Sequence, residues 1–284
     1  MTAIATSGPA TARPRSDSER VGVGDWWSDT VVYAGRNIEH IRQIPEKLLD
    51  VTLQPLMFVL LFAYVFGGAI NVGGSYREYI IGGILIQSLA FGLTGPATAI
   101  STDLNEGVID RFRSLPASRI AYVTGHYLAE LAGMALSIAV LLGAGLLVGW
   151  RVHTDLAHLT TALLLLLTFS SAMIWIGTWI GLKVRSPDAV MGVGFVAVFP
   201  LTFLSNAFVP INTLPNALQW VAAWNPISVM VAAMRELFGN PLSPLVKHTW
   251  PLEHAVPAAF VYCGVILAIA IPASLRRYRV RTSD

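Results

Sequence analysis

The stretch LTTALLLLLTFSSAMIWIGTWIGL, residues 159–182, decides the fold class of this chain. It contains no Asp, Glu, Lys or Arg, and it is long enough to cross a bilayer, which takes roughly 20 mostly apolar residues. Its apolar residues are continuous rather than alternating, which favours a helix over a half-buried strand. Because a segment inside lipid must satisfy its own backbone hydrogen bonds, the stretch predicts a membrane-spanning helix.

Five other apolar runs have the same character. With residues 159–182 they predict six spans, at about residues 52–70, 78–100, 120–149, 159–182, 189–209 and 255–274. The composition agrees, with 54% hydrophobic and 13% charged residues and a mean hydropathy of +0.60, whereas a soluble domain carries about 25% charged residues. We therefore expect an all-α integral membrane protein in which residues 51–275 form a six-helix domain.

The Lys and Arg residues outside these runs predict the orientation. Fifteen of the nineteen lie in the N-terminal region, in the loops after the second and fourth spans, and in the C-terminal tail. The other four, Arg235 among them, lie in the remaining loops. Both termini are therefore expected to be cytoplasmic, with residues 1–24 forming a disordered tail and residues 276–284 a second short tail. Residues 1–24 lack the apolar core of a signal peptide.

Residues 25–50 contain many apolar residues, but no apolar run among them is long enough to span a membrane. Apolar and charged residues are interleaved, and Trp26 and Trp27 stand near the start. This pattern favours an amphipathic helix that lies in the cytoplasmic interface. An ordinary amphipathic linker is the alternative.

The segment 210–254 is Pro-rich and partly apolar, and we expect it to be a re-entrant or interfacial helical segment on the external side. Asn225 is a good N-cap and Pro226 suits the first helical position. The helix that they begin should end at Phe238, because Gly239 follows it.

The most charged stretch between two spans is NEGVIDRFRSLPASR, residues 105–119. Over residues 103–116 the apolar residues fall on one face of a helix, and Asp103 and Glu106 have the spacing of a capping box. We therefore expect a short amphipathic helix along the cytoplasmic face. The residues alone leave two interpretations open: a positively charged anchor that fixes topology, or a docking surface in which Gly107 provides a notch.

Several residues within the spans are candidates for a translocation path. Glu130 lies inside the third apolar run with His126 one turn earlier, and a charge in a span costs about 2.5–3.5 kcal/mol on insertion scales. The pair is either a polar or proton-sensitive point in the path or an interfacial pair near the cytoplasmic end. Phe199, Phe203 and Asn206 are further candidates, for which lipid contact or core packing is the alternative.

Small residues also recur at helical spacing. The pairs Gly145/Gly149 and Gly177/Gly181 each have the small-xxx-small pattern that lets two helices approach closely. We expect both to serve packing within one subunit.

Absent motifs exclude several classes of function. Cys263 is the only cysteine, so neither an internal disulfide nor a cysteine metal cluster is possible. None of the three lysines belongs to a GxxxxGK[ST] loop, so this chain is not expected to bind ATP. The sequence also lacks HExxH and GxSxG, which disfavours a membrane-embedded protease or lipid transferase.

The pattern Glu106-Gly107-x-x-x-Arg111-x-x-Ser114-Leu115-Pro116 resembles the cytoplasmic loop of type-2 ATP-binding-cassette (ABC) exporter permeases. Other stretches resemble the daunorubicin/doxorubicin-resistance subgroup, and they are PEKLLDVT (45–52), FGG (66–68), REYI (77–80), FPLTF (199–203) and NPIS (225–228) with Arg235. The resemblance covers about residues 40–280. It implies six helices per subunit, two such subunits, and a separate ATPase on each.

The resemblance also implies a site and partners. Residues 103–116 would be the coupling helix, and its ATPase-docking residues would be Glu106, Gly107, Arg111, Phe112, Arg113 and Leu115. The chain itself would hold no cofactor or metal, since the two partner ATPase subunits bind ATP and Mg. Its other partners would be a second copy of itself, the lipid bilayer and a hydrophobic or amphipathic small molecule, with no nucleic acid.

The expected function is that of a multi-pass permease in the bacterial plasma membrane, which exports a drug or antibiotic-like compound. It is a transport subunit and not an enzyme. One alternative keeps the fold but changes the cargo to a lipid or a lipid-linked glycan. A second alternative, from another class, is a membrane-embedded lipid-modifying enzyme that works without an ATPase.

Overall fold

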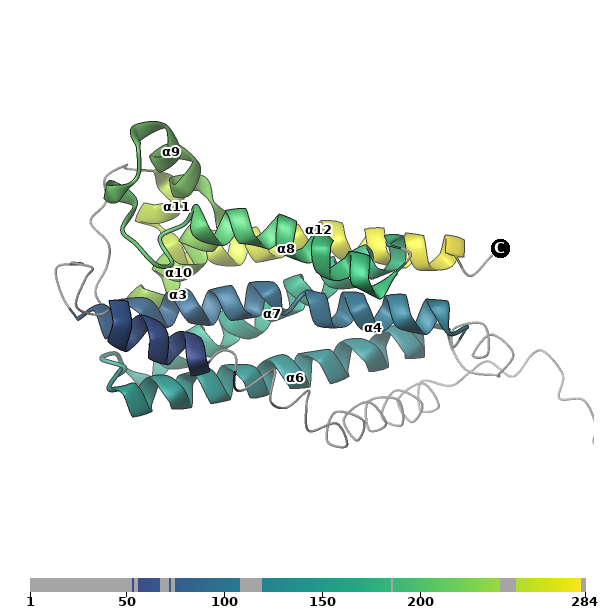
Figure 1. Ribbon diagram of the computed structural model, residues 1–284, viewed down its shortest axis with the longest axis horizontal. Helices are drawn as coiled ribbons and strands as arrows, with labels where there is room; N and C mark the ends of the chain where they lie inside the picture. Colours follow the sequence, from purple (N-terminus) through teal and green to yellow (C-terminus); the bar gives the residue numbers. More distant parts are fainter. Residues whose placement is uncertain are drawn as a thin grey trace, which may run out of the picture.

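The computed structural model describes residues 53, 56–66, 72, 75–107, 119–184, 186–240 and 249–281. Within these ranges the chain is helical and has no strand. The long helices lie side by side along one axis, and the short helices α9, α10 and α11 gather near one end (Figure 1). The elements are η1 (Leu61–Phe66), α3 (Tyr76–Phe91), α4 (Thr94–Asn105), α6 (Arg119–Val148), α7 (Leu156–Lys183), α8 (Pro187–Phe203), η2 (Ile211–Thr213), α9 (Asn216–Trp224), α10 (Pro226–Phe238), α11 (Trp250–Glu253) and α12 (Ala255–Arg281).

Four stretches are long and apolar enough to cross a membrane, and they match the second, third, fourth and sixth predicted spans. They are Tyr76–Asn105, Thr124–Val148, Leu156–Lys183 and Ala255–Val280. The first and fifth predicted spans are also apolar helices, but they are shorter, at Leu56–Val65 and Pro187–Phe203. The all-helical membrane fold is therefore confirmed with four candidate spans, or five if α9 and α10 count as one. Six crossings remain a prediction.

Within the segment predicted to be re-entrant or interfacial, α9 and α10 form a helix pair that bends by 70° at Asn225, and we call this pair the α9–α10 hairpin. Asn225 caps α10 by accepting a hydrogen bond from the Ile227 N–H at 2.9 Å, and Pro226 is the first helical residue. The helix ends at Phe238 because Gly239 has a left-handed φ of 69°. These bounds are the predicted ones.

Helix α7 packs closely against α4 through its two spaced glycines. A Cβ atom at Gly177 would lie 2.2 Å from the Leu93 oxygen, and one at Gly181 would lie 2.4 Å from the Ala97 oxygen. The predicted packing within one subunit is confirmed for this pair. The other pair behaves differently, since Gly145 lies close to Ile81 of α3 while Gly149 has φ 100° and ends α6.

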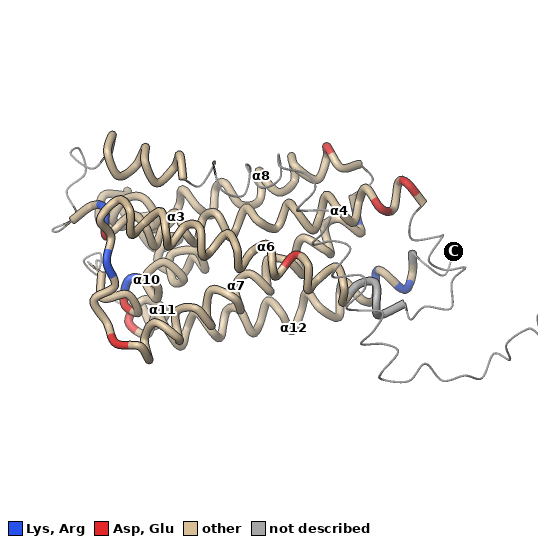
Figure 2. The backbone as a smooth tube through the Cα atoms, turned by 90° about the horizontal axis from the view of Figure 1, so that it is seen from below, with Lys and Arg blue, Asp and Glu red and all other residues tan. Residues whose placement is uncertain are grey.

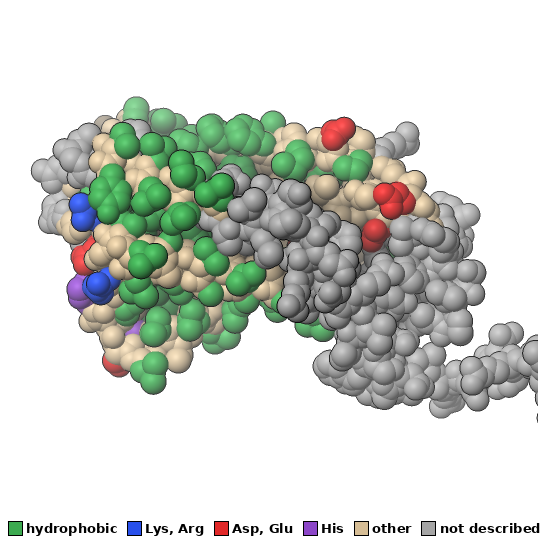
Figure 3. Space-filling view, turned by 60° about the horizontal axis from the view of Figure 1, so that its bottom comes forward, with side chains coloured by type: hydrophobic (Ala, Val, Ile, Leu, Met, Phe, Trp, Pro, Cys, Tyr) green, Lys and Arg blue, Asp and Glu red, His purple; other side chains and the backbone are tan. Residues whose placement is uncertain are grey.

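Among the described residues, charged side chains lie near the two ends of the bundle, apart from one acidic position within α6 (Figure 2). We call the end with α9, α10 and α11 the hairpin end, and the end with the C-terminal part of α12 the tail end. Between them, hydrophobic side chains are numerous on the part of the surface that the described residues form (Figure 3). Such an apolar band between two charged ends is the surface that a bilayer requires.

The predicted tail at 1–24 and the amphipathic helix at 25–50 lie outside the described residues. The predicted C-terminal tail begins inside α12, because this helix continues to Arg281.

Candidate functional site

A buried arginine holds the α9–α10 hairpin to the rest of the bundle. Arg235 of α10 is 1% exposed. Its Nε donates to the Tyr79 carbonyl of α3 at 2.9 Å, and its Nη2 donates to the carbonyls of Asn206 and Ala207 at 2.9 and 3.2 Å. The guanidinium also lies 3.4 Å from the Tyr79 ring centroid. A buried cation is costly unless it is paired or hydrogen-bonded, and these three bonds hold α10 against α3 and residues 206–207, while Nη1 has no hydrogen-bond partner among the described residues.

Two other polar side chains of the hairpin bind the same region. Asn225 donates through Nδ2 to the carbonyls of Leu201 and Leu204, at 2.7 and 2.8 Å, which lie at the end of α8. Ser228 accepts a hydrogen bond from the Asn206 N–H at 3.2 Å. We call the set Tyr79, Asn206, Asn225, Ser228 and Arg235 the hairpin junction.

The junction explains two departures from the sequence prediction. Arg235 was counted among the loop cations, but it is buried within α10 and contributes no surface charge. The fifth predicted span was expected to continue to residue 209, but α8 ends at Phe203. It ends there because Asn225 binds carbonyl groups at its end, while the Ser205 hydroxyl donates to the Thr202 carbonyl and accepts from the Ala207 N–H.

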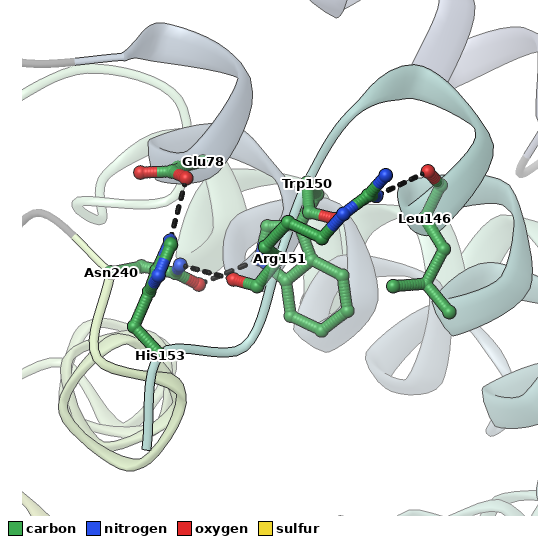
Figure 4. Close-up of polar contacts among 6 residues, drawn as sticks. All are labelled: Glu78, Leu146, Trp150, Arg151, His153 and Asn240. Carbon is green, nitrogen blue, oxygen red and sulfur yellow. Dashed lines mark hydrogen bonds and ion pairs between the residues drawn. The ribbon is translucent and has the colours of Figure 1, made fainter.

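Close to the junction, a second polar cluster joins three segments at the hairpin end (Figure 4). Asn240, just after α10, accepts a hydrogen bond from the Trp150 indole N–H at 2.6 Å and donates to the Arg151 carbonyl at 3.0 Å. His153 lies 2.8 Å from Glu78 at the start of α3, measured from Nε2 to Oε1. The turn between α6 and α7 is therefore tied to both α3 and α10.

A ladder of phenylalanines runs along α8. Successive ring centroids are 4.7 Å apart for Phe195 and Phe199, 4.3 Å for Phe199 and Phe203, 5.2 Å for Phe203 and Phe208, and 4.7 Å for Phe208 and Phe62. We call these five residues the aromatic ladder. Phe195, Phe199 and Phe203 are 53%, 38% and 47% exposed, so the described chain leaves a continuous aromatic surface uncovered.

The other candidate path residues lie elsewhere. His126 is buried on α6, and Glu130 is partly buried beside α4, where a Cβ at Gly95 would lie 3.3 Å from its Oε2. Helix α4 packs against both α6 and α8, so it lies between these two residues and the aromatic ladder. Asn206 is 3% exposed and belongs to the hairpin junction. The sequence candidates therefore fall into three separate places.

The predicted coupling helix does not begin where the capping pattern placed it. Asp103 belongs to the last turn of α4, Glu106 is its C-cap, and Gly107 has a left-handed φ of 65°. The helix dipole disfavours acidic residues at a helix C-terminus, where Asp103 and Glu106 lie. The capping-box interpretation had placed these two residues at a helix N-terminus instead. Glu106 is exposed. Arg111, Phe112, Arg113 and Leu115 lie outside the described residues.

The hairpin junction is the part of the site that sequence reasoning missed. Its signals were present, because Arg235 is a charge inside an apolar helix and Asn225 and Ser228 lie on the helix that carries it. Sequence alone gives no contact between residues 79, 206 and 235, since these residues are far apart in the chain.

A helical bundle with an apolar middle and four candidate spans among its described residues defines an integral membrane protein. Residues 29–238 match the ABC-2 type transporter family. The chain belongs to this family, and it is a multi-pass permease subunit that carries no ATPase domain and binds no cofactor. Permeases of ABC transporters pair with ATPase subunits.

Two relatives illustrate where the chain lies within the family. It is 32% identical over 211 residues to the daunorubicin resistance ABC transporter permease protein DrrB1 of Streptomyces coeruleorubidus. The aligned residues make up 74% of this chain and 75% of the relative. It is 23% identical over 214 residues to the doxorubicin resistance ABC transporter permease protein DrrB of Mycobacterium tuberculosis, with 75% and 74% covered. The expected family is thereby confirmed.

Proposed function

We propose that this chain is the permease subunit of a bacterial ATP-driven exporter that moves amphipathic, aromatic compounds out of the cell. The observation that carries the proposal is the exposed aromatic ladder on α8. Planar aromatic molecules stack favourably on such rings at centroid distances of about 4.5–7 Å. The names of the two relatives, which refer to daunorubicin and doxorubicin resistance, support the same class of cargo.

In this proposal two copies of the chain stand with their aromatic ladders facing a shared path. Two ATPase subunits bind at the tail end, which is cytoplasmic together with both termini. Positively charged residues near the tail end support this orientation, because Lys183 is the last residue of α7 and Arg276, Arg277 and Arg279 lie in the last turns of α12.

The ATPase subunits act on the segment that follows α4. Glu106 and Gly107 are the first of its docking residues, and Arg111, Phe112, Arg113 and Leu115 continue the set. Closure of the ATPases around ATP would push this segment and so move α4. The close packing at Gly177 and Gly181 passes that movement to α7.

The test is daunorubicin transport into inside-out bacterial membrane vesicles that hold the chain and its ABC ATPase subunit. We expect uptake that requires ATP and falls when Phe199 and Phe203 are both changed to Ala. A matched variant, Leu163→Ala and Leu164→Ala, removes two exposed apolar side chains from α7 and should leave uptake unchanged. Equal uptake by both double variants would show that the ladder does not contact the cargo. ATP-driven movement of a lipid or lipid-linked glycan without daunorubicin uptake would make the proposed cargo wrong.

A further inference from the structure

Helices α7 and α12 pack against each other and run in the same direction. Both begin at the hairpin end and reach the tail end. The Ser274 hydroxyl of α12 donates to the Trp175 carbonyl of α7 at 3.2 Å, which sets the register of the two helices. Because both helices then advance by about 1.5 Å per residue, Arg277 of α12 lies at the level of Thr178 on α7.

Two cations meet at this level. Arg277 follows Ser274 by three residues and so lies on the side of α12 that is turned toward α7. Its Nε is enclosed by protein and has no hydrogen-bond partner among the described residues. On α7, the Lys183 ammonium lies back over the Trp179 ring, 3.9 Å from the ring centroid, which brings it to the same level. We call Lys183 and Arg277 the basic site.

Nothing in the two helices balances this charge. Neither α7 nor α12 contains an Asp or a Glu, and neither cation of the basic site forms an ion pair with a described residue. An enclosed guanidinium nitrogen without a hydrogen bond is unfavourable, so the site calls for an anion. Cations near a helix end also suit the helix dipole. That role applies equally to Arg276 and Arg279, which are exposed, and it does not need an enclosed Nε.

The surface that leads to the basic site faces lipid. Along α7 the residues that are exposed or partly exposed recur at helical spacing, at Leu164, Ser171, Trp175 and Trp179, and the row ends at Lys183. Helix α7 is a candidate membrane span, so this row lies beside hydrocarbon and its cation stands where the hydrocarbon ends. An anion that reaches the site along this row must carry an apolar chain.

We propose that the basic site binds the phosphate of one anionic phospholipid, with an acyl chain of that lipid lying along Trp175 and Trp179. Arg and Lys both suit phosphate, because its oxygens accept charge-assisted hydrogen bonds, and basic pockets between membrane helices bind anionic headgroups. Phosphatidylglycerol fits this site, whereas phosphatidylcholine brings an ammonium group of its own that the two cations repel. The bound phosphate also joins the tail ends of α7 and α12.

This inference requires only that the tail end lies at a membrane surface. It does not depend on the cargo or on the direction of transport, so it can fail without affecting the proposed function.

The test is native mass spectrometry of the purified full chain in detergent with equal amounts of phosphatidylglycerol and phosphatidylcholine that have the same acyl chains. We expect the wild type to retain phosphatidylglycerol at least about tenfold more than phosphatidylcholine, since the phosphate accepts hydrogen bonds from two charged groups. The double variant Lys183→Gln, Arg277→Gln should lose this preference.

The matched control is the double variant Arg276→Gln, Arg279→Gln, which removes the same charge. These two residues lie on the side of α12 turned away from Ser274, so the preference should remain. The buried thiol of Cys263 reports that each variant is folded by remaining unreactive to a maleimide dye.

Four results would overturn the proposal. The first is a wild type without preference for phosphatidylglycerol, and the second is an equal loss in both double variants, which would mean diffuse attraction. Soluble glycerol phosphate bound as strongly as the lipid would mean that a free phosphate is the ligand. An unchanged preference in the Lys183→Gln, Arg277→Gln variant, together with loss of the co-purifying ATPase subunit, would assign the two cations to that partner.

Discussion

Replacing Arg235 by Lys tests the hairpin junction without removing its positive charge. The guanidinium donates to three carbonyl oxygens on two segments and stacks on the Tyr79 ring. A Lys ammonium is a compact point charge and cannot reach α3 and residues 206–207 with the same planar geometry. Leaving one buried carbonyl unsatisfied costs about 1–3 kcal/mol, and weakening the cation–π contact adds about 1 kcal/mol. We therefore expect Arg235→Lys to lower the free energy of unfolding by about 2–4 kcal/mol, or roughly 30- to 900-fold in the unfolding equilibrium.

Cys263 supplies the assay for this prediction. It is the only cysteine of the chain, it is buried, and its Sγ lies 3.9 Å from the Met230 sulfur of α10. The temperature at which it reacts with a fluorogenic maleimide in detergent therefore reports unfolding next to the hairpin, and it should fall by several degrees. Arg151→Lys is the matched control, because Arg151 also donates to two carbonyls, at 2.7 and 2.8 Å, but is exposed, so water replaces what it loses. Equal midpoints for Arg235→Lys and the wild type, or an equal loss in both variants, would refute the reasoning.

Three further predictions follow from the packing and the polar contacts. Gly181→Leu should prevent α7 from packing on α4, since even a Cβ would lie 2.4 Å from the Ala97 oxygen, whereas Gly264→Leu on α12 should be tolerated because no atom of the described chain lies within 4 Å of an added Cβ. The yield of monodisperse protein in size-exclusion chromatography measures both. Gly107→Ala should lower the maleimide midpoint only slightly, because a non-glycine residue at φ 65° costs about 1 kcal/mol and no described residue lies within 4 Å of the added Cβ; a collapse of expression would contradict this. Asn225→Ala should cost about 1–2 kcal/mol in the same assay, since it removes the cap of α10 and two bonds to α8; an unchanged midpoint would show that the cap is dispensable.

The membrane class and most of the helices could be predicted from the sequence, because a long apolar run in lipid has few structures open to it other than a helix. The bounds of α10 were also accessible, since Asn225, Pro226 and Gly239 act locally on the backbone. Local signals failed where a helix end is decided by a distant partner. Helix α8 stops before its apolar run ends because the Asn225 side chain donates hydrogen bonds to the carbonyls at the helix end. No pattern within residues 189–209 predicts that contact.

The charged segment after α4 shows a second reason for failure. Asp103 and Glu106 have the spacing of a helix start, but the preceding helix continues through them and stops at Gly107. A capping pattern is evidence for a start only where the previous helix has already ended, and the run from Thr94 to Asn105 contains no residue that ends it. The aromatic ladder was found only in part, since Phe199 and Phe203 share a face of α8 by spacing while Phe62 and Phe208 reach it through the tertiary fold.

The most direct test of the central claim is whether a partner ATPase drives transport through Glu106. Proteoliposomes that hold this chain and its ABC ATPase subunit should transport daunorubicin with ATP, and Glu106→Ala together with Gly107→Trp should abolish transport while the partner's basal ATP hydrolysis continues. The double variant should still insert and keep the wild-type midpoint of Cys263 reactivity to within a few degrees. Full ATP-driven transport by the double variant, or transport by this chain without any ATPase subunit, would contradict the account.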